Sequence, residues 1–264
     1  MRRLSAVPHR YILYLRLMQP FIIGLKYIYT IYTALVFVIL LLITFPFFMM
    51  LALFGDKSLL PMLWLCRFIA LGLMFFCGIV YRFHRNPAYT RNTPFVIIAN
   101  HRSNMDAPVA AISCKGRVRY LAKKELLKVP VMGQIFKVMS VYVDRSSSQD
   151  RRASVEKLKR YLNEGDSIFL FPEGTRNKTD QPTIDFKDGA FTIAVQTQTP
   201  IMPMIYVGSD GIMPNKRPLL RPGIIDIYQL DPIPVAGLTD ADIPALKQSV
   251  RALIEETFLK FSSH

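Results

Sequence analysis

The N-terminal third of this chain contains almost no acidic residues. Residues 1–94 hold ten Lys and Arg but a single acid, Asp56, which gives a net charge of +9 against +5 for the remainder. This charge lies beside long apolar runs, and no aromatic-basic motif of an RNA or DNA binder appears. The distribution therefore favours contact with an anionic membrane surface and argues against nucleic acid as a partner.

Cysteine and histidine are also scarce. The chain has three cysteines, Cys66, Cys77 and Cys114, and their spacing matches no metal site. We expect three unpaired thiols without a catalytic role, and no metal. Three of the four histidines lie in the basic N-terminal tail, in a basic stretch and at the last position. His101 is therefore the candidate for an imidazole base.

Two long apolar segments precede the rest of the chain. The first, from Tyr27 to Phe54, is 28 residues without a charge, whereas a membrane span needs about 20. The second, from Leu59 to Tyr81, is interrupted by Arg67, which predicts a shorter span or an interfacial element. Basic residues flank both outer ends and place them on the cytosolic side. We predict a membrane-embedded helical hairpin within residues 1–90; the alternative is a signal anchor followed by an ordinary buried helix.

Beyond residue 90, short apolar runs alternate with longer amphipathic stretches. Strands are expected at Phe95–Ala99, Val118–Ala122, Ser140–Val143, Ser167–Phe171, Ile201–Val207 and Ile224–Gln229. Helices are expected at Asp106–Ser113, Val131–Val138, Gln149–Asn163, Gly189–Thr197 and Ala241–Phe261. This alternation is typical of α/β domains. We therefore predict that residues 91–264 form a layered α/β domain, with a mostly buried mixed sheet flanked by helices.

The stretch from Asn100 to Asp106 pairs the candidate base with a carboxylate. Residues five apart in a helix differ by about 140° around its axis, so His101 must precede the helix, with Asp106 in its first turn and Ser103 as the N-cap. The N–H groups of a helix start favour developing negative charge. A His base oriented by a carboxylate beside such donors suits acyl transfer. On its own, the pattern also fits a capping box next to a surface histidine.

Three further stretches could present groups to an anionic ligand. An apolar strand runs into Pro172-Glu173-Gly174-Thr175-Arg176, a turn in which the glycine allows close backbone approach. Arg145 ends another strand and could hold a phosphate in a bidentate grip. Lys124 lies in a basic edge after a third strand. Taken singly, each stretch is equally well explained as a turn, a solvated ion pair or a solvated edge.

Together, these blocks resemble the glycerolipid acyltransferases, and most of all the lysophosphatidic acid (1-acylglycerol-3-phosphate) acyltransferases. The matching blocks are Asn100-His101-x-Ser103-x-x-Asp106, Asp144-Arg145, Phe171 to Arg176 without a gap, and Pro200-Ile201-x-Pro203. The resemblance covers residues 90–230. Asn177 stands where many members have Ser, and Arg102 fills the variable position of the first block. Both could mark a different acceptor.

The resemblance implies a membrane enzyme in which His101, oriented by Asp106, is the general base. It would transfer a fatty acyl group from acyl-CoA or acyl-carrier protein to the free hydroxyl of a lysophospholipid. The expected acceptor is 1-acylglycerol 3-phosphate, which would give phosphatidic acid. Backbone donors near the helix start would hold the oxyanion. The residues expected to bind the glycerol phosphate are Arg145, Glu173, Gly174, Thr175 and Arg176, with Lys124 as a weaker candidate.

The same resemblance implies that no cofactor takes part, because the thioester donor is already activated. The catalytic domain would lie on the cytoplasmic side of a membrane, such as the bacterial inner membrane. Two alternatives stay open. The first is the same chemistry on another lysophospholipid, a lyso-aminolipid or glycerol 3-phosphate. The second is a non-catalytic membrane lipid-binding protein on this fold, which the intact His101 and Asp106 pair disfavours.

Overall fold

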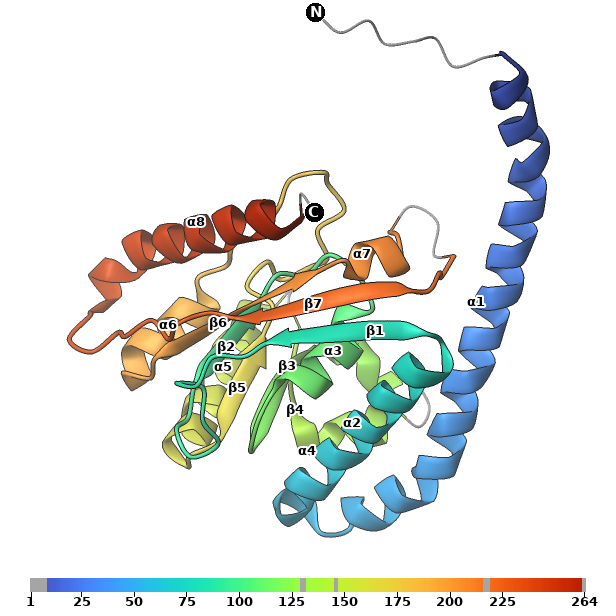
Figure 1. The fold of residues 1–264 in the computed structure, drawn as a ribbon. Coiled ribbons are helices and arrows are strands. Elements are labelled where there is room, and N and C mark those ends of the chain that lie inside the picture. Colours follow the sequence, from blue (N-terminus) through green and yellow to red (C-terminus); the bar gives the residue numbers. More distant parts are fainter. Residues whose placement is uncertain (1–8, 129–131, 145–146, 216–218, 263–264) are drawn as a thin grey trace, which may run out of the picture.

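A computed structural model describes residues 9–128, 132–144, 147–215 and 219–262 (Figure 1). Two long helices come first and are followed by a seven-stranded sheet with helices on both of its faces. The predicted fold class, a mixed sheet flanked by helices and preceded by a helical hairpin, is confirmed. The three cysteines are unpaired, as predicted.

The hairpin consists of α1 (His9–Ala52) and α2 (Leu59–Phe76), joined by the 3-10 helix η1 (Gly55–Ser58). The two helices run antiparallel: the Tyr32 hydroxyl donates to the Phe76 carbonyl at 3.0 Å, and Leu40 packs on Gly72. Both helices are long and apolar enough to cross a membrane. Their exposed large side chains include Phe21, Ile28, Ile31, Leu35, Leu42, Trp64, Phe68 and Phe75.

Arg67, the charge that interrupts the second apolar segment, points away from the exposed face of α2. Its Nε donates to the carbonyl of Ala111 at 3.4 Å, and its Nη2 donates to the carbonyl of Cys114. These carbonyls lie at the C-terminal end of α3 (Asp106–Ser113), where a cation complements the helix dipole. The arginine therefore binds α2 to the following domain and needs no contact with lipid.

The sheet has the strand order β1-β7-β6-β2-β5-β3-β4. Its strands are β1 (Ile79–His84), β2 (Val96–Ala99), β3 (Val118–Lys123), β4 (Ser140–Val143), β5 (Ser167–Leu170), β6 (Ile201–Val207) and β7 (Gly223–Gln229). The neighbouring strands β6, β2, β5, β3 and β4 are parallel, whereas β7 pairs antiparallel with β6. The carboxyl ends of the five parallel strands therefore meet at one edge of the sheet.

Strand β1 is absent from the sequence-based prediction. We expected the second apolar segment to continue to Tyr81, but α2 ends at Phe76, and Gly78 turns the chain with φ +59°. Residues 79–84 then pair in parallel with β7 at the border of the sheet. The apolar composition does not reveal this change from helix to strand, because an exposed edge strand and a membrane helix are both rich in apolar residues. The domain boundary expected between residues 90 and 91 stays a prediction, although β1 precedes it and joins the sheet.

Helices cover both faces of the sheet, and the alternation of side chains along β2 shows how they divide. Ile97 and Ala99 face the core shared with α2 and α3, whereas Val96 and Ile98 face the opposite core. The remaining helices are η2 (Lys124–Lys128), α4 (Met132–Met139), α5 (Ser148–Asn163), α6 (Gly189–Thr197), α7 (Ser209–Ile212), η3 (Asp240–Asp242) and α8 (Ile243–Ser262). Of these, α5, α6 and α8 contribute to the opposite core.

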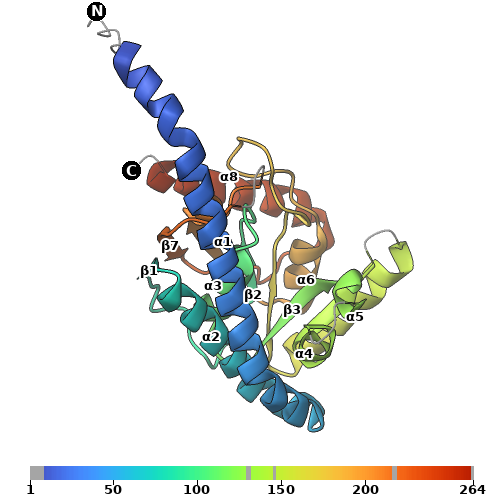
Figure 2. The ribbon, with the colours of Figure 1, turned by 90° about the vertical axis from the view of Figure 1, so that its right-hand side faces the viewer.

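Helix α1 runs along one side of the domain. Figure 2 shows it passing in front of α2, α3 and β2. The Thr30 hydroxyl on α1 accepts a hydrogen bond from the backbone N–H of Leu220 at 2.9 Å. At the other end of the hairpin, Asp56 in η1 pairs with the buried Arg119 of β3 at 3.0 Å. The hairpin is thus fixed to the domain near both of its ends.

Candidate active site

The site begins where the central strand β2 ends. Asn100 follows β2, and its side chain exchanges two hydrogen bonds with the backbone of Tyr206 on β6, at 2.9 and 2.8 Å. Asn100 is 1% exposed, so both bonds lie in a protein interior where unpaired polar groups are costly. This amide fixes the end of the strand and so the position of the next residue, His101.

His101 and Asp106 form a hydrogen-bonded pair. Nδ1 of His101 lies 2.9 Å from Oδ2 of Asp106. The carboxylate is fully buried, whereas the imidazole side chain is 18% exposed. Because the Asp106 carboxylate accepts the Nδ1 proton, the lone pair of the neutral ring lies on Nε2. The ring also stacks on Phe171, with centroids 4.0 Å apart. His101 is therefore held in one orientation with one nitrogen available for proton transfer.

The start of α3 differs in two details from the prediction. Asp106 is the first residue of α3 and His101 precedes it, as expected, but the N-cap is Met105. The Ser103 hydroxyl accepts from the Met105 N–H at 3.2 Å and donates to the Met213 carbonyl at 3.0 Å. The N–H groups of Arg102 and Ser103 both donate to Oδ2 of Asp106, at 2.7 Å. These two donors are engaged by the Asp106 carboxylate, and backbone donors for an oxyanion near the helix start stay a prediction.

Glu173 lies beneath the histidine, in the turn that follows β5. Its Oε1 accepts from the His101 N–H at 2.7 Å, and its Oε2 accepts from the Ile184 N–H at 3.2 Å. The residue is 1% exposed. Burial raises the pKa of this carboxyl to about 7, against the lowering effect of the two backbone N–H groups. The geometry gives Glu173 a positioning function between two loops; its predicted contact with the glycerol phosphate stays a prediction.

A second network surrounds the backbone of His101 and Arg102. The Asn177 N–H donates to the His101 carbonyl at 2.7 Å. The Asn215 amide donates to the carbonyls of Arg102 and Asn177, at 2.7 and 3.0 Å, and its Oδ1 accepts from Arg176 at 3.1 Å. Sequence reasoning missed Asn215, because no local pattern marks it. Asn177, noted there as a possible sign of a different acceptor, is buried and supports the loop.

Arg102, in the variable position of the first block, is also engaged. Its Nε donates to Asp210 at 2.8 Å, and its guanidinium lies 5.1 Å from the Phe258 ring centroid. Arg102 therefore links the histidine loop to α7 and α8.

The remaining predicted site residues spread along the same edge of the sheet. Gly174 adopts φ +69° in the turn after β5, and Thr175 beside it is exposed. Lys124 is exposed after β3, where it pairs with Asp150 at 3.0 Å. Arg145 lies outside the described residues. Neighbouring strands are about 4.8 Å apart, so Lys124 follows a strand about 10 Å from β2.

Comparison with known proteins places this chain among acyltransferases. A family model described as Acyltransferase matches residues 81–207. The human 1-acyl-sn-glycerol-3-phosphate acyltransferase alpha is 30% identical over 199 residues, which cover 75% of this chain and 70% of that enzyme. The chain belongs to this acyltransferase family. The human beta enzyme is 33% identical over 171 residues, and the chain spans 61% of its length.

A solved acyltransferase structure has the same fold as this chain. The crystal structure of the 1-acyl-sn-glycerophosphate (LPA) acyltransferase PlsC from Thermotoga maritima matches with a TM-score of 0.75 at 21% identity. The match covers 90% of this chain and 98% of that one. The coverage extends beyond the 81–207 region matched by the family model. The resemblance inferred from the sequence blocks is therefore confirmed for both the family and the fold.

Proposed function

We propose that this protein transfers an acyl group from an acyl thioester to the free hydroxyl of 1-acylglycerol 3-phosphate, giving phosphatidic acid. The observation that carries the proposal is the His101 and Asp106 pair, with Nδ1 bonded to a buried carboxylate and the ring partly exposed. The names of the family members of known activity agree with this acceptor. The donor is acyl-CoA or acyl-carrier protein.

The proposed chemistry uses two proton transfers. Nε2 of His101 takes the proton from the acceptor hydroxyl as its oxygen attacks the thioester carbon, and Asp106 stabilises the resulting imidazolium. The tetrahedral intermediate then expels the thiolate, which recovers the proton from Nε2. The ester and the free thiol are the products. The reactivity of the thioester replaces an added cofactor.

The acceptor phosphate would lie over the turn that follows β5. Thr175 is exposed, and Arg176 is half-buried beside Asn215. Arg176 can approach a phosphate as a planar donor pair. We extend this binding region to Lys124, which follows β3 at the same edge of the sheet, and to Arg145, which lies outside the described residues. Glu173 and Gly174 would shape the turn beneath it.

The position of the hairpin fits an acceptor that resides in a membrane. Ser103 of the histidine loop bonds to the carbonyl of Met213, and Leu220 further along this segment bonds to Thr30 of α1. The active-site loop is therefore connected to the apolar helix through one short segment of chain. We propose that the catalytic domain lies on the cytoplasmic side of the membrane, and the basic residues at the outer ends of the hairpin support this.

The test is acyl transfer from labelled acyl-CoA, and from acyl-carrier protein, to a panel of lysolipids and glycerol 3-phosphate in detergent micelles. His101→Ala should lower the rate by about 10²–10⁴-fold. His84→Ala is a matched control, because His84 on β1 lies 3.0 Å from Asp226 on β7 in a second His–Asp contact. This control should keep full activity.

The outcome of this assay distinguishes the proposed function from its two alternatives, another acceptor and a non-catalytic lipid-binding protein. Activity on 1-acylglycerol 3-phosphate that depends on His101 but not on His84 supports the proposal. Activity on another acceptor alone would keep the mechanism and replace the substrate. No transfer from either donor to any acceptor would favour the non-catalytic lipid-binding alternative.

A further inference from the structure

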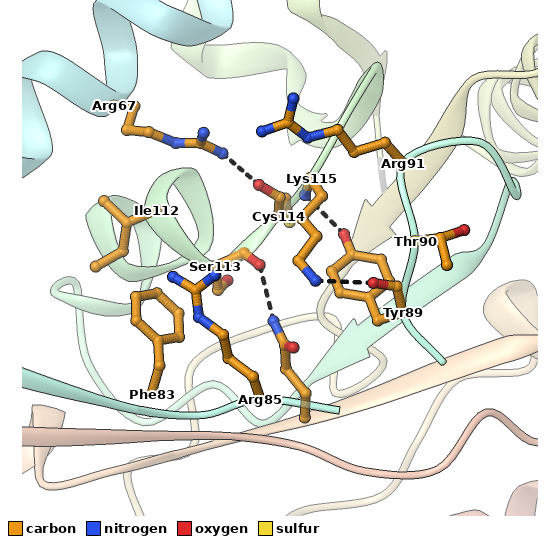
Figure 3. Close-up of a pocket in the computed structure, with 11 residues that line it drawn as sticks. Arg67, Phe83, Arg85, Tyr89, Thr90, Arg91, Ile112, Ser113, Cys114 and Lys115 are labelled. Atoms are coloured by element: carbon orange, nitrogen blue, oxygen red, sulfur yellow. Dashed lines mark hydrogen bonds between the residues drawn. The ribbon is translucent and has the colours of Figure 1, made fainter. Parts of the chain in front are cut away.

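A basic pocket lies at the edge of the sheet opposite His101. It has a volume of about 380 Å³ and is bounded by the middle of α2, the C-terminal end of α3, and the chain between β1 and β2 (Figure 3). Helix α3 has eight residues, so it separates this pocket from the histidine loop by about 12 Å. The pocket is therefore distinct from the proposed catalytic site.

The walls of this pocket carry four cationic side chains and no carboxylate. Arg67 comes from α2, Arg85 and Arg91 from the chain between β1 and β2, and Lys115 from the chain after α3. Figure 3 shows their charged groups around one space. Within the described part of the chain, none of the four makes an ion pair with Asp or Glu. Burial lowers the pKa of Lys115, and the charges of Arg85 and Arg91 lower it further. These cations repel one another without a compensating anion.

The backbone around the pocket holds the cations in place. Gly116 has φ +70°, and a Cβ on it would lie 3.0 Å from the Arg91 carbonyl oxygen, so glycine permits this close approach. Lys115 Nζ donates to the Tyr89 carbonyl at 2.8 Å, and its N–H donates to the Tyr89 hydroxyl at 2.8 Å. Arg85 and Arg91 are exposed. The rim is therefore open, while the floor is fixed by Arg67 and Lys115.

We propose that this pocket binds the phosphate group of a ligand other than the reacting acceptor. The exposed guanidinium groups of Arg85 and Arg91 can offer paired donors to phosphate oxygens. Arg67 and Lys115, which already donate to carbonyls, add positive charge to the site. The phosphate would come from the headgroup of an anionic membrane phospholipid or from a soluble phosphate compound. The ligand would contact the C-terminal end of α3, the helix that begins at Asp106.

The test is native mass spectrometry of the full chain in detergent micelles, which counts bound probe molecules. The probes are pyrophosphate and phosphatidylglycerol, with phosphatidylcholine as the lipid without net charge. In R85Q/R91Q, one site should bind at least about tenfold more weakly, because each lost charged hydrogen bond contributes that much. R152Q/R160Q is the matched control, since it removes two exposed arginines of α5 on the opposite face of the sheet.

The melting temperature and the acyl-transfer rate of R85Q/R91Q show whether this variant folds. If it does not fold, R85K/R91K replaces it, and this variant should bind the probe more weakly because lysine cannot make the bidentate contact. Selective loss of phosphatidylglycerol supports a lipid headgroup as the ligand. Selective loss of pyrophosphate supports a soluble phosphate compound. Unchanged numbers and affinities for both probes in the pocket variant would overturn the proposal.

Discussion

Glu173→Gln tests whether a buried carboxyl beneath His101 makes stability depend on pH. The pKa of Glu173 is about 7 in the folded protein against 4.5 for an ordinary glutamate. Below pH 4.5 the group is protonated in both the folded and the unfolded chain. Between pH 4.5 and pH 7 only the folded protein keeps the proton, so its stability falls as pH rises. Above pH 7 the full cost of a buried charge is present.

This difference in pKa corresponds to about 3 kcal/mol of unfolding free energy. Glutamine cannot ionise, so the variant lacks this pH dependence. Its amide can accept from only one of the His101 and Ile184 N–H groups, which costs about 1–3 kcal/mol at every pH. Relative to wild type, the variant should therefore be least stable at pH 5. Its free energy of unfolding should rise by about 3 kcal/mol relative to that of wild type between pH 5 and pH 8.

Thermal unfolding in detergent between pH 5 and pH 8 measures this change. At about 2–4 °C per kcal/mol, the difference in Tm between Glu173→Gln and wild type should change by roughly 6–12 °C over this range. Glu164→Gln, at an exposed glutamate, is the control for loss of a carboxylate. A Tm difference that stays constant from pH 5 to pH 8 would refute the reasoning.

Three further predictions concern other residues of the site and its supports. Asp106→Asn should lower kcat by about 10²–10⁴-fold, because the amide no longer favours the imidazolium. Steady-state kinetics measure this in a variant whose Tm equals that of wild type, and a normal kcat would contradict the prediction. Arg67→Met should destabilise the protein by about 2 kcal/mol, because carbonyls at the end of α3 lose their donor; equal melting of the variant and wild type would contradict this. Gly174→Ala should cost about 1–2 kcal/mol, because φ is +69° there and alanine disfavours that region; Asn, which tolerates it better, should cost less in the same melting assay.

Local patterns predicted much of the sheet and the pairing of His101 with Asp106. Strand β6 and helices α3 and α6 have the predicted bounds, because apolar runs between turn residues specify an element without distant partners. The order of His101 and Asp106 followed from helix geometry alone. In contrast, β1 could not be separated from the apolar segment before it. Its strand conformation depends on pairing with β7, more than 140 residues later.

The hydrogen bonds that hold the site in place could not be predicted from the sequence. The Phe-Pro-Glu-Gly block indicated a functional turn, but the two backbone N–H groups that Glu173 accepts from are 72 and 11 residues away. Likewise, Asn215 reaches Arg102 across 113 residues. Such contacts depend on which strands become neighbours. The predicted N-cap at Ser103 was wrong for a similar reason, since its hydroxyl binds Met213 in a distant segment.

The attachment of the hairpin at both ends has a consequence for how a substrate is found. Thr30 binds Leu220 near the edge of the sheet that holds His101, and Asp56 in η1 pairs with Arg119 near the opposite edge. A domain that is attached to the hairpin at two points cannot rotate freely about a single linker. Its orientation relative to the membrane therefore follows that of the helices. If the helices lie in a bilayer, each encounter with a lipid is a two-dimensional search, and the collision rate depends on the acceptor's surface density.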